Sequence, residues 1–103
     1  MNDEDAAAEV PQVFTLSQNA PNPFNPSTVI GFDLASDMPV HLAVYSASGR
    51  KVRKLVSGHM RAGRNSIAWD GRDGAGQPVS SGVYLYRLEA GGKSETRKML
   101  LIR

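Results

Sequence analysis

Residues 82–92 read Gly-Val-Tyr-Leu-Tyr-Arg-Leu-Glu-Ala-Gly-Gly, and this stretch decides the fold class. Tyr84, Tyr86 and Leu88 share one face of an extended chain, because side chains along a strand alternate with a period of two. The two glycines that follow favour a tight turn. The stretch therefore predicts a strand over residues 83–90 and a hairpin that leads into another strand.

The same alternation recurs on both sides of this hairpin, and it predicts six further strands. They are expected over residues 13–16, 27–35, 40–45, 51–57, 65–70 and 96–103. The alternation breaks down within 51–57, which indicates a bulge or an edge strand protected by its Lys and Arg residues. Residues 99–102 are apolar on both faces, so we expect the last strand to be central or capped by another element. Residues 58–63 are expected to form a turn.

About seven short strands with frequent turns predict an all-β fold, an immunoglobulin-like antiparallel β-sandwich. A chain of 103 residues fits one domain. Trp69 is expected in the core between the two sheets. Residues 1–11 are acidic and Ala-rich, which predicts a flexible linker or tail. The sandwich is then expected to span residues 12–103.

The composition excludes several classes of function. There is no cysteine, which excludes disulfides, thiolate metal sites and thiol catalysis. No apolar run reaches the roughly 20 residues that span a membrane. All 12 Lys and Arg follow the acidic residues 1–9, but they are spread over several segments, so nucleic acid is not an expected partner. No signal peptide is visible, and we expect any export signal to lie outside this chain.

The sequence offers little for catalysis, and we expect no enzyme activity, cofactor or metal. His41 is predicted to face solvent and His59 to lie in a turn, with no serine or carboxylate expected beside either. Asp70 and Asp73 could ligate calcium, but their spacing differs from that of an EF-hand loop. We favour two Asx-type turns, in which glycines such as Gly76 take positive φ.

Two further groups of residues have a structural and a functional interpretation. Trp69 and the tyrosines could form a sugar-stacking strip, but so few aromatics are better explained by core packing, with Tyr45 as the most exposed ring. The second group is a proline-rich stretch that excludes both helix and central strand. It comprises Pro21, Asn22, Pro23, Phe24, Asn25 and Pro26. We expect Phe24 to cover the core rather than to contact a receptor directly.

Four segments in order resemble a known family. Residues 16–28, Leu-Ser-Gln-Asn-Ala-Pro-Asn-Pro-Phe-Asn-Pro-Ser-Thr, are similar to the opening of the C-terminal sorting domains of the type IX secretion system. The resemblance continues through residues 44–52 and 82–88 and ends in the basic, then apolar, residues 97–103. Together the segments cover about residues 13–103. Residues 69–82 are more similar to the immunoglobulin-like domain of the flagellar hook-capping protein.

The resemblance implies a non-enzymatic signal that carries an attached cargo across the outer membrane. Its implied partners are the outer-membrane secretion machinery, a sortase-like peptidase and an N-terminal cargo domain, with a secreted or cell-surface destination. Residues 1–11 would link to the cargo, and Arg103 would be the natural C-terminus. The alternatives are a carbohydrate-binding or adhesive module and a self-associating module like the hook cap.

We hypothesise that the last strand and its neighbour form the recognition surface. Main-chain pairing would give affinity, and the charges of Lys98 and Arg103 would add complementarity. The candidate recognition residues are Gly82, Val83, Tyr84, Lys98, Met99, Leu100, Leu101, Ile102 and Arg103.

Overall fold

A computed structural model describes residues 12–103 as an all-β structure of seven strands. The strands are β1 (Phe14–Leu16), β2 (Thr28–Leu34), β3 (Met38–Ser46), β4 (Lys51–Met60), β5 (Gly63–Trp69), β6 (Gly82–Ala90) and β7 (Lys93–Leu101). Residues 12–103 hold no α-helix, and so none that could span a lipid bilayer. The linker expected over residues 1–11 lies outside the described residues.

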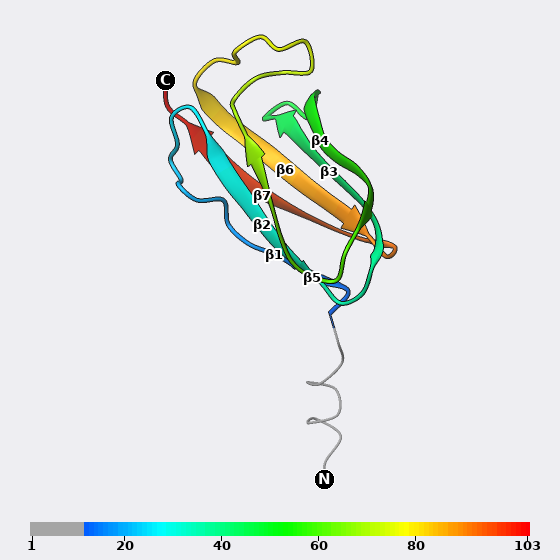
Figure 1. The fold of residues 1–103 in the computed structure, drawn as a ribbon. Coiled ribbons are helices and arrows are strands. Elements are labelled where there is room, and N and C mark those ends of the chain that lie inside the picture. The colour runs from blue at the N-terminus through cyan, green and yellow to red at the C-terminus, as the bar shows by residue number, and fades with distance from the viewer. Residues whose placement is uncertain (1–11) are drawn as a thin grey trace.

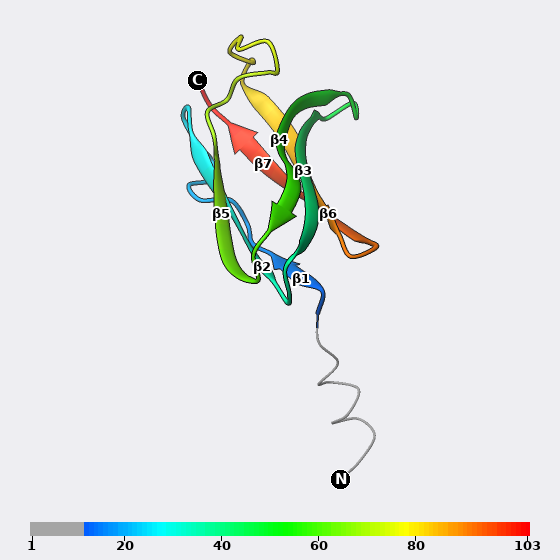
Figure 2. The ribbon, with the colours of Figure 1, turned by 45° about the vertical axis from the view of Figure 1, so that its right-hand side comes forward.

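The strands form two antiparallel sheets that face each other (Figures 1 and 2). The three-stranded sheet has the order β1-β2-β5, and the four-stranded sheet has the order β4-β3-β6-β7. The β6–β7 hairpin predicted from residues 82–92 is present, with Ala90 paired to Lys93. These features confirm the predicted immunoglobulin-like sandwich.

The core lies between the two sheets and is built from the apolar faces that the alternation predicted. Its largest fully buried side chains are Trp69, Tyr86, Phe24, Phe32, Ile30, Leu42, Leu88, Met99, Leu101, Val40 and Val44. Trp69 therefore occupies the expected position between the sheets. The burial of so much apolar surface is the main stabilising term of a sandwich this small.

The edge strand β4 explains the irregular sequence of residues 51–57. Its pairing with β3 shifts register between Leu42 and Ala43 and again between Val44 and Tyr45. Both alternatives left open for this segment are thus present, because β4 carries bulges and also ends the four-stranded sheet. Basic side chains on such an edge disfavour pairing with another chain.

Two expectations about strand limits were wrong. The turn expected over residues 58–63 is shorter, because β4 continues to Met60 and places His59 in a strand. The last strand begins at Lys93 rather than at residue 96, because the hairpin turn is tight. β7 is also not central, since it forms the other end of the four-stranded sheet. A different element caps it, as the next subsection describes.

The two ends of the sandwich carry different elements (Figure 1). The chain enters β1 at one end, beside the β6–β7 hairpin. The C-terminus lies at the opposite end, beside the long loop of residues 70–81 that joins β5 to β6. We call this second end the C-terminal end. The candidate recognition residues gather there.

Candidate functional site

The outer edge of β7 is covered along its second half by the proline-rich segment, here defined as residues 17–27. The Phe24 backbone N–H donates to the Leu100 carbonyl over 3.0 Å, and the Ile102 N–H donates to the Phe24 carbonyl over 2.9 Å. Side chains complete the cover. Asn22 Oδ1 accepts from the Leu100 N–H at 2.9 Å, and Gln18 Nε2 donates to the Lys98 carbonyl at 2.7 Å. The prediction that another element caps the last strand is therefore confirmed.

Phe24 anchors the proline-rich segment in the core, as predicted. Its side chain is 2% exposed, and its ring centroid lies 5.8 Å from that of Trp69. Trp69 in turn meets Tyr84 edge-on at 5.6 Å, a favourable geometry for aromatic pairs. Trp69 Nε1 donates to the Arg72 carbonyl over 2.9 Å. These rings are core residues, so they cannot form an exposed sugar-stacking strip, and Tyr45 is the least buried tyrosine.

A buried polar network fixes the start of the proline-rich segment, and sequence analysis missed it. The Tyr86 hydroxyl donates to the Ser17 carbonyl at 2.7 Å and accepts from the Asn19 N–H at 2.9 Å. Asn19 Nδ2 also donates to Thr28 Oγ1 at 3.0 Å. Burial raises the pKa of Tyr86 above its ordinary value of 10.0, while the Asn19 hydrogen bond and the Arg97 charge lower it less strongly. Asn19 and Thr28 are buried polar residues, which in a folded domain need such partners.

Arg103 is held by the long loop and is therefore not a free charge for a partner. Its guanidinium donates to the carbonyls of Val79 and Gly71 over 2.5 and 2.6 Å, and its backbone N–H donates to Ser81 Oγ over 2.8 Å. A side chain at Gly71 would meet the Pro26 carbonyl at 2.9 Å, and Gly71 also has φ +74°. This close packing requires glycine.

Asp70 and Asp73 form the Asx-type turns that the sequence favoured. Asp70 Oδ1 accepts from the Arg72 N–H at 3.1 Å, and Asp73 Oδ1 accepts from two backbone N–H groups at 2.9 Å. Gly76, which closes the turn, has φ +83° as expected. Across residues 12–103, no three His, Asp or Glu side chains cluster in a way that could hold a metal ion.

The structure corrects one expectation about the histidines. Ser57 Oγ lies 3.4 Å from His41 Nδ1, and Glu89 is the cross-strand partner of His41 on the other side. A serine and a carboxylate thus do flank His41. All three groups lie on the open face of the sheet, and the Glu89 carboxylate pairs with Arg87 at 3.3 Å. His41 and Glu89 line an open depression of about 520 Å³ beside the β6–β7 hairpin, but the His41 and Ser57 side chains are exposed to water, whereas a nucleophile needs a water-poor site.

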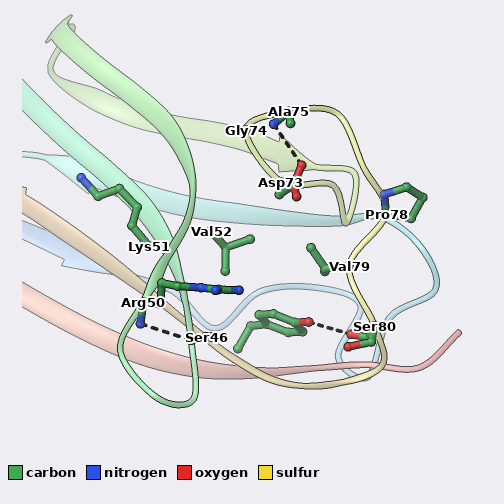
Figure 3. A pocket seen from close by; sticks show the side chains of 11 residues that line it. Ser46, Arg50, Lys51, Val52, Asp73, Gly74, Ala75, Pro78, Val79 and Ser80 are labelled. Carbon is green, nitrogen blue, oxygen red and sulfur yellow. Dashed lines mark hydrogen bonds between the residues drawn. The ribbon is translucent and has the colours of Figure 1, made fainter.

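A cleft of about 560 Å³ opens at the C-terminal end, between the β3–β4 turn and the long loop (Figure 3). Val52 and Val79 lie on its facing sides, the Arg50 side chain extends into it, and the Lys51 side chain points away from it. The Gly74 N–H donates to the Val52 carbonyl at 3.0 Å and ties the loop to β4. The cleft has a mixed lining with both basic and acidic residues, and this lining contains no histidine to serve as a base.

The cations of β4 and β5, which belong to different sheets, point to different parts of the surface. Arg53 donates to the carbonyls of the long loop and lies 3.6 Å from Asp70. Arg64 pairs with Asp33 at 3.0 Å on the three-stranded sheet. Lys54 faces outward opposite Ala43 on the four-stranded sheet. This distribution does not form the continuous basic stripe that tracks a nucleic-acid backbone.

Of the candidate recognition residues, those with exposed side chains lie together on the outer face of the four-stranded sheet. Val83 is paired directly with Leu100, and Leu85 with Lys98. Val83, Leu100 and Ile102 are 45%, 37% and 49% exposed. Tyr84, Met99 and Leu101 point into the core instead, and Gly82 pairs with Leu101 at the strand end. Three of the nine candidate recognition residues are thus core residues, and a recognition role for the exposed ones stays a prediction.

Tyr45 and Leu85 extend this exposed surface, and sequence analysis did not select them as recognition residues. Tyr45 is the cross-strand partner of Leu85, and both line a shallow pocket of about 190 Å³ with Arg87, Thr96 and Gly49. The signal was present in the sequence, because the residues between the core positions of 82–90 include two further apolar side chains, Val83 and Leu85. A strand that is apolar on both faces buries one face and offers the other.

The two antiparallel sheets and the core packed between them define this chain as an immunoglobulin-like β-sandwich. Residues 17–94 match the FlgD Ig-like domain family, so the chain belongs to that family of structural modules. A search of the curated proteins gave no match.

Solved structures share the fold at low sequence identity. The chain is similar to part of dimeric latent PorU from Porphyromonas gingivalis, with a TM-score of 0.72 and 24% identity over 90% of this chain and 10% of that one. PorZ from the same organism is described as an essential bacterial surface component of the type IX secretion system. It matches with a TM-score of 0.59 and 22% identity, over 84% of this chain and 11% of the PorZ chain. FlgD from Xanthomonas campestris, described as involved in hook capping, matches with a TM-score of 0.60 and 24% identity, over 85% of this chain and 64% of the FlgD chain. This chain thus spans about a tenth of the PorU and PorZ chains.

Proposed function

We propose that this domain is a non-enzymatic sorting and anchoring module, which directs an attached cargo across the outer membrane by the type IX secretion system. The observation that carries the proposal is the structural likeness to PorU, together with the ordered sorting-domain motifs of residues 16–28, 44–52, 82–88 and 97–103. The likeness to PorZ points to the same system. In this proposal the partners are the secretion machinery, a sortase-like peptidase and an N-terminal cargo domain, and the destination is the cell surface.

The geometry suits such a role because the recognised element is already folded. The last strand contributes Met99 and Leu101 to the core while it presents Leu100 and Lys98 to solvent. A partner can therefore recognise this face without chemistry and without unfolding the domain. The described residues hold no metal-binding cluster and no enclosed site with an oriented base, so a binding role is the better account.

The test is a fusion of residues 1–103 to the C-terminus of a periplasmic reporter, expressed in a bacterium that has a type IX system. We expect the reporter to reach the cell surface, where added protease digests it in intact cells. The same fusion in a strain that lacks the translocon serves as the control. A folded fusion that stays in the periplasm of the competent strain would refute the proposal.

A self-associating structural module is the second candidate, because the family match and the likeness to FlgD favour it. This function predicts a dimer or ring in solution at micromolar concentration. Sedimentation velocity of the purified chain measures this directly. A monomer at all accessible concentrations would exclude the candidate, whereas a defined ring without surface display would favour it over sorting.

A further inference from the structure

The outer face of the four-stranded sheet carries a strip of exposed and half-buried apolar side chains at its C-terminal end. The strip crosses three neighbouring strands through direct cross-strand pairs, and we define it as Tyr45, Leu85, Val83 and Leu100. Ile102 adjoins it, just beyond β7. Val83, Leu100 and Ile102 are three of the four exposed large hydrophobic residues in the described chain. Apolar side chains gathered in this way are typical of a protein contact, whereas scattered ones need no explanation.

Recognition by addition of a strand to β7 is disfavoured on this structure. The outward main-chain groups at Lys98, Leu100 and Ile102 are already bound to Gln18, Asn22 and Phe24. A partner strand would have to displace the proline-rich segment, and with it the buried Phe24 ring. The main-chain pairing expected from the sequence is therefore not available along this part of β7. The side chains on the face remain available.

The charges around the strip indicate the chemistry of the partner. Lys98 is the cross-strand partner of Leu85, and Lys51 is the cross-strand partner of Tyr45. Within residues 12–103, no carboxylate lies within 4.0 Å of either ammonium group. A second copy of this chain would bring equal charges together, whereas a surface with carboxylates around an apolar centre would complement them.

We propose that this strip is the docking surface for the secretion machinery, and that it binds an apolar protein surface bordered by acidic side chains through side-chain contacts. The inference rests on the proposed sorting function and specifies how the domain is recognised. It assigns Tyr45 and Leu85 to the recognition surface and removes Arg103, whose guanidinium is held by the long loop. It also removes Met99 and Leu101, which are core residues.

The chain offers a matched pair of variants to test the strip. Val83 and Val29 are both 45% exposed and each is the second residue of its strand, but Val29 belongs to the three-stranded sheet. Val83→Asp places a carboxylate against the apolar and acidic partner surface, and we expect surface display of the fusion to fall about tenfold or more. Val29→Asp makes the same chemical change on the other sheet and should leave display at the wild-type level. Lys98→Glu should lower display several-fold.

The melting temperatures of the purified variants separate docking from folding. We expect Val83→Asp and Val29→Asp to lower the melting temperature equally, because both exchange a half-exposed β-branched residue for a poor strand former. If the wild-type fusion reaches the surface and the Val83→Asp and Val29→Asp fusions are displayed equally, the proposed docking surface is refuted while the proposed sorting function stands. Retention of the wild-type fusion in the periplasm would refute the sorting function, and the docking surface with it. A dimer that only Val83→Asp dissolves would assign the strip to self-association and overturn the proposal.

Discussion

Phe24→Ala is the substitution that best tests how the proline-rich segment holds the domain together. The side chain is 2% exposed, packs on Trp69 between the sheets and belongs to no long strand. Deleting a buried phenyl ring costs about 3–5 kcal/mol of unfolding free energy, from the lost transfer term and the cavity left behind. The total for a domain of this size is about 5–15 kcal/mol. The variant should therefore be close to the limit of stable folding.

The assay combines a global and a local measurement. Urea denaturation should show the loss of about 3–5 kcal/mol, and the melting temperature should fall by roughly 12 °C or more. Hydrogen exchange at the Ile102 amide reports the local effect, because this N–H donates to the Phe24 carbonyl. We expect its protection to fall more than that of the central pair Val44 and Tyr86. Phe24→Leu, which leaves a smaller cavity, serves as the graded control and should lose less.

Two results would contradict this reasoning. A loss below about 1 kcal/mol would show that the ring is not a core anchor, since replacing a core phenylalanine by alanine typically costs about 3–5 kcal/mol. Unchanged exchange at Ile102 would show that the cover on β7 does not depend on Phe24. If stability is unchanged but the fusion is no longer displayed, Phe24 contacts a partner directly.

Three further predictions test other parts of the structure. Tyr86→Phe should lose about 1–3 kcal/mol, because it leaves the buried Ser17 carbonyl and Asn19 N–H without their partner. Burial raises the pKa of Tyr86, so the contribution of this residue to the free energy of unfolding is present below pH 10 and is lost as the pH rises through the raised pKa. The melting temperature of the wild type should therefore fall at alkaline pH by an amount that the variant does not show. Asp73→Ala should lower the melting temperature modestly by removing two backbone caps, and calcium should not change the melting temperature of the wild type. Deletion of residues 98–103 should abolish the cooperative unfolding transition in circular dichroism, because it removes two core residues; a normal transition would contradict the structural role of the last strand.

The strands that could be predicted from the sequence are those with one face buried in the core and the other face exposed to solvent. Residues 82–90 and 40–45 show this alternation clearly, and both strands lie in the centre of the four-stranded sheet. The limits of β4 were harder to predict from the sequence, because an edge strand with bulges buries little of either face. Gly58 indicated a turn, but it lies within β4 with a φ of +152°, a value that glycine adopts readily and other residues rarely do. Edge position, rather than local sequence, decides such a case.

The cover over β7 could not be located from the sequence, because it depends on contacts distant in the chain. Gln18 and Lys98 are separated by 80 residues, and Asn22 and Leu100 by 78. The proline pattern predicted that residues 21–26 avoid both helix and central strand, and the size of Phe24 predicted an anchor. Neither feature says which strand lies alongside. For the same reason, the recognition surface that we propose lies on the outer face of the four-stranded sheet, whereas the sequence led us to expect it along the edge of β7.

The burial of the last strand also limits how a receptor could read it. If a receptor separated β7 from the sandwich and bound it as an extended peptide, it would expose Met99 and Leu101 at about 2–5 kcal/mol each. It would also break the hydrogen bonds to the proline-rich segment. The sum approaches the whole stability of the domain, so that mode requires unfolding before recognition. Docking on the face formed by Tyr45, Leu85, Val83 and Leu100 leaves the fold intact. A variant on this face should therefore lower display without a matching loss of stability, whereas a core variant should lower both.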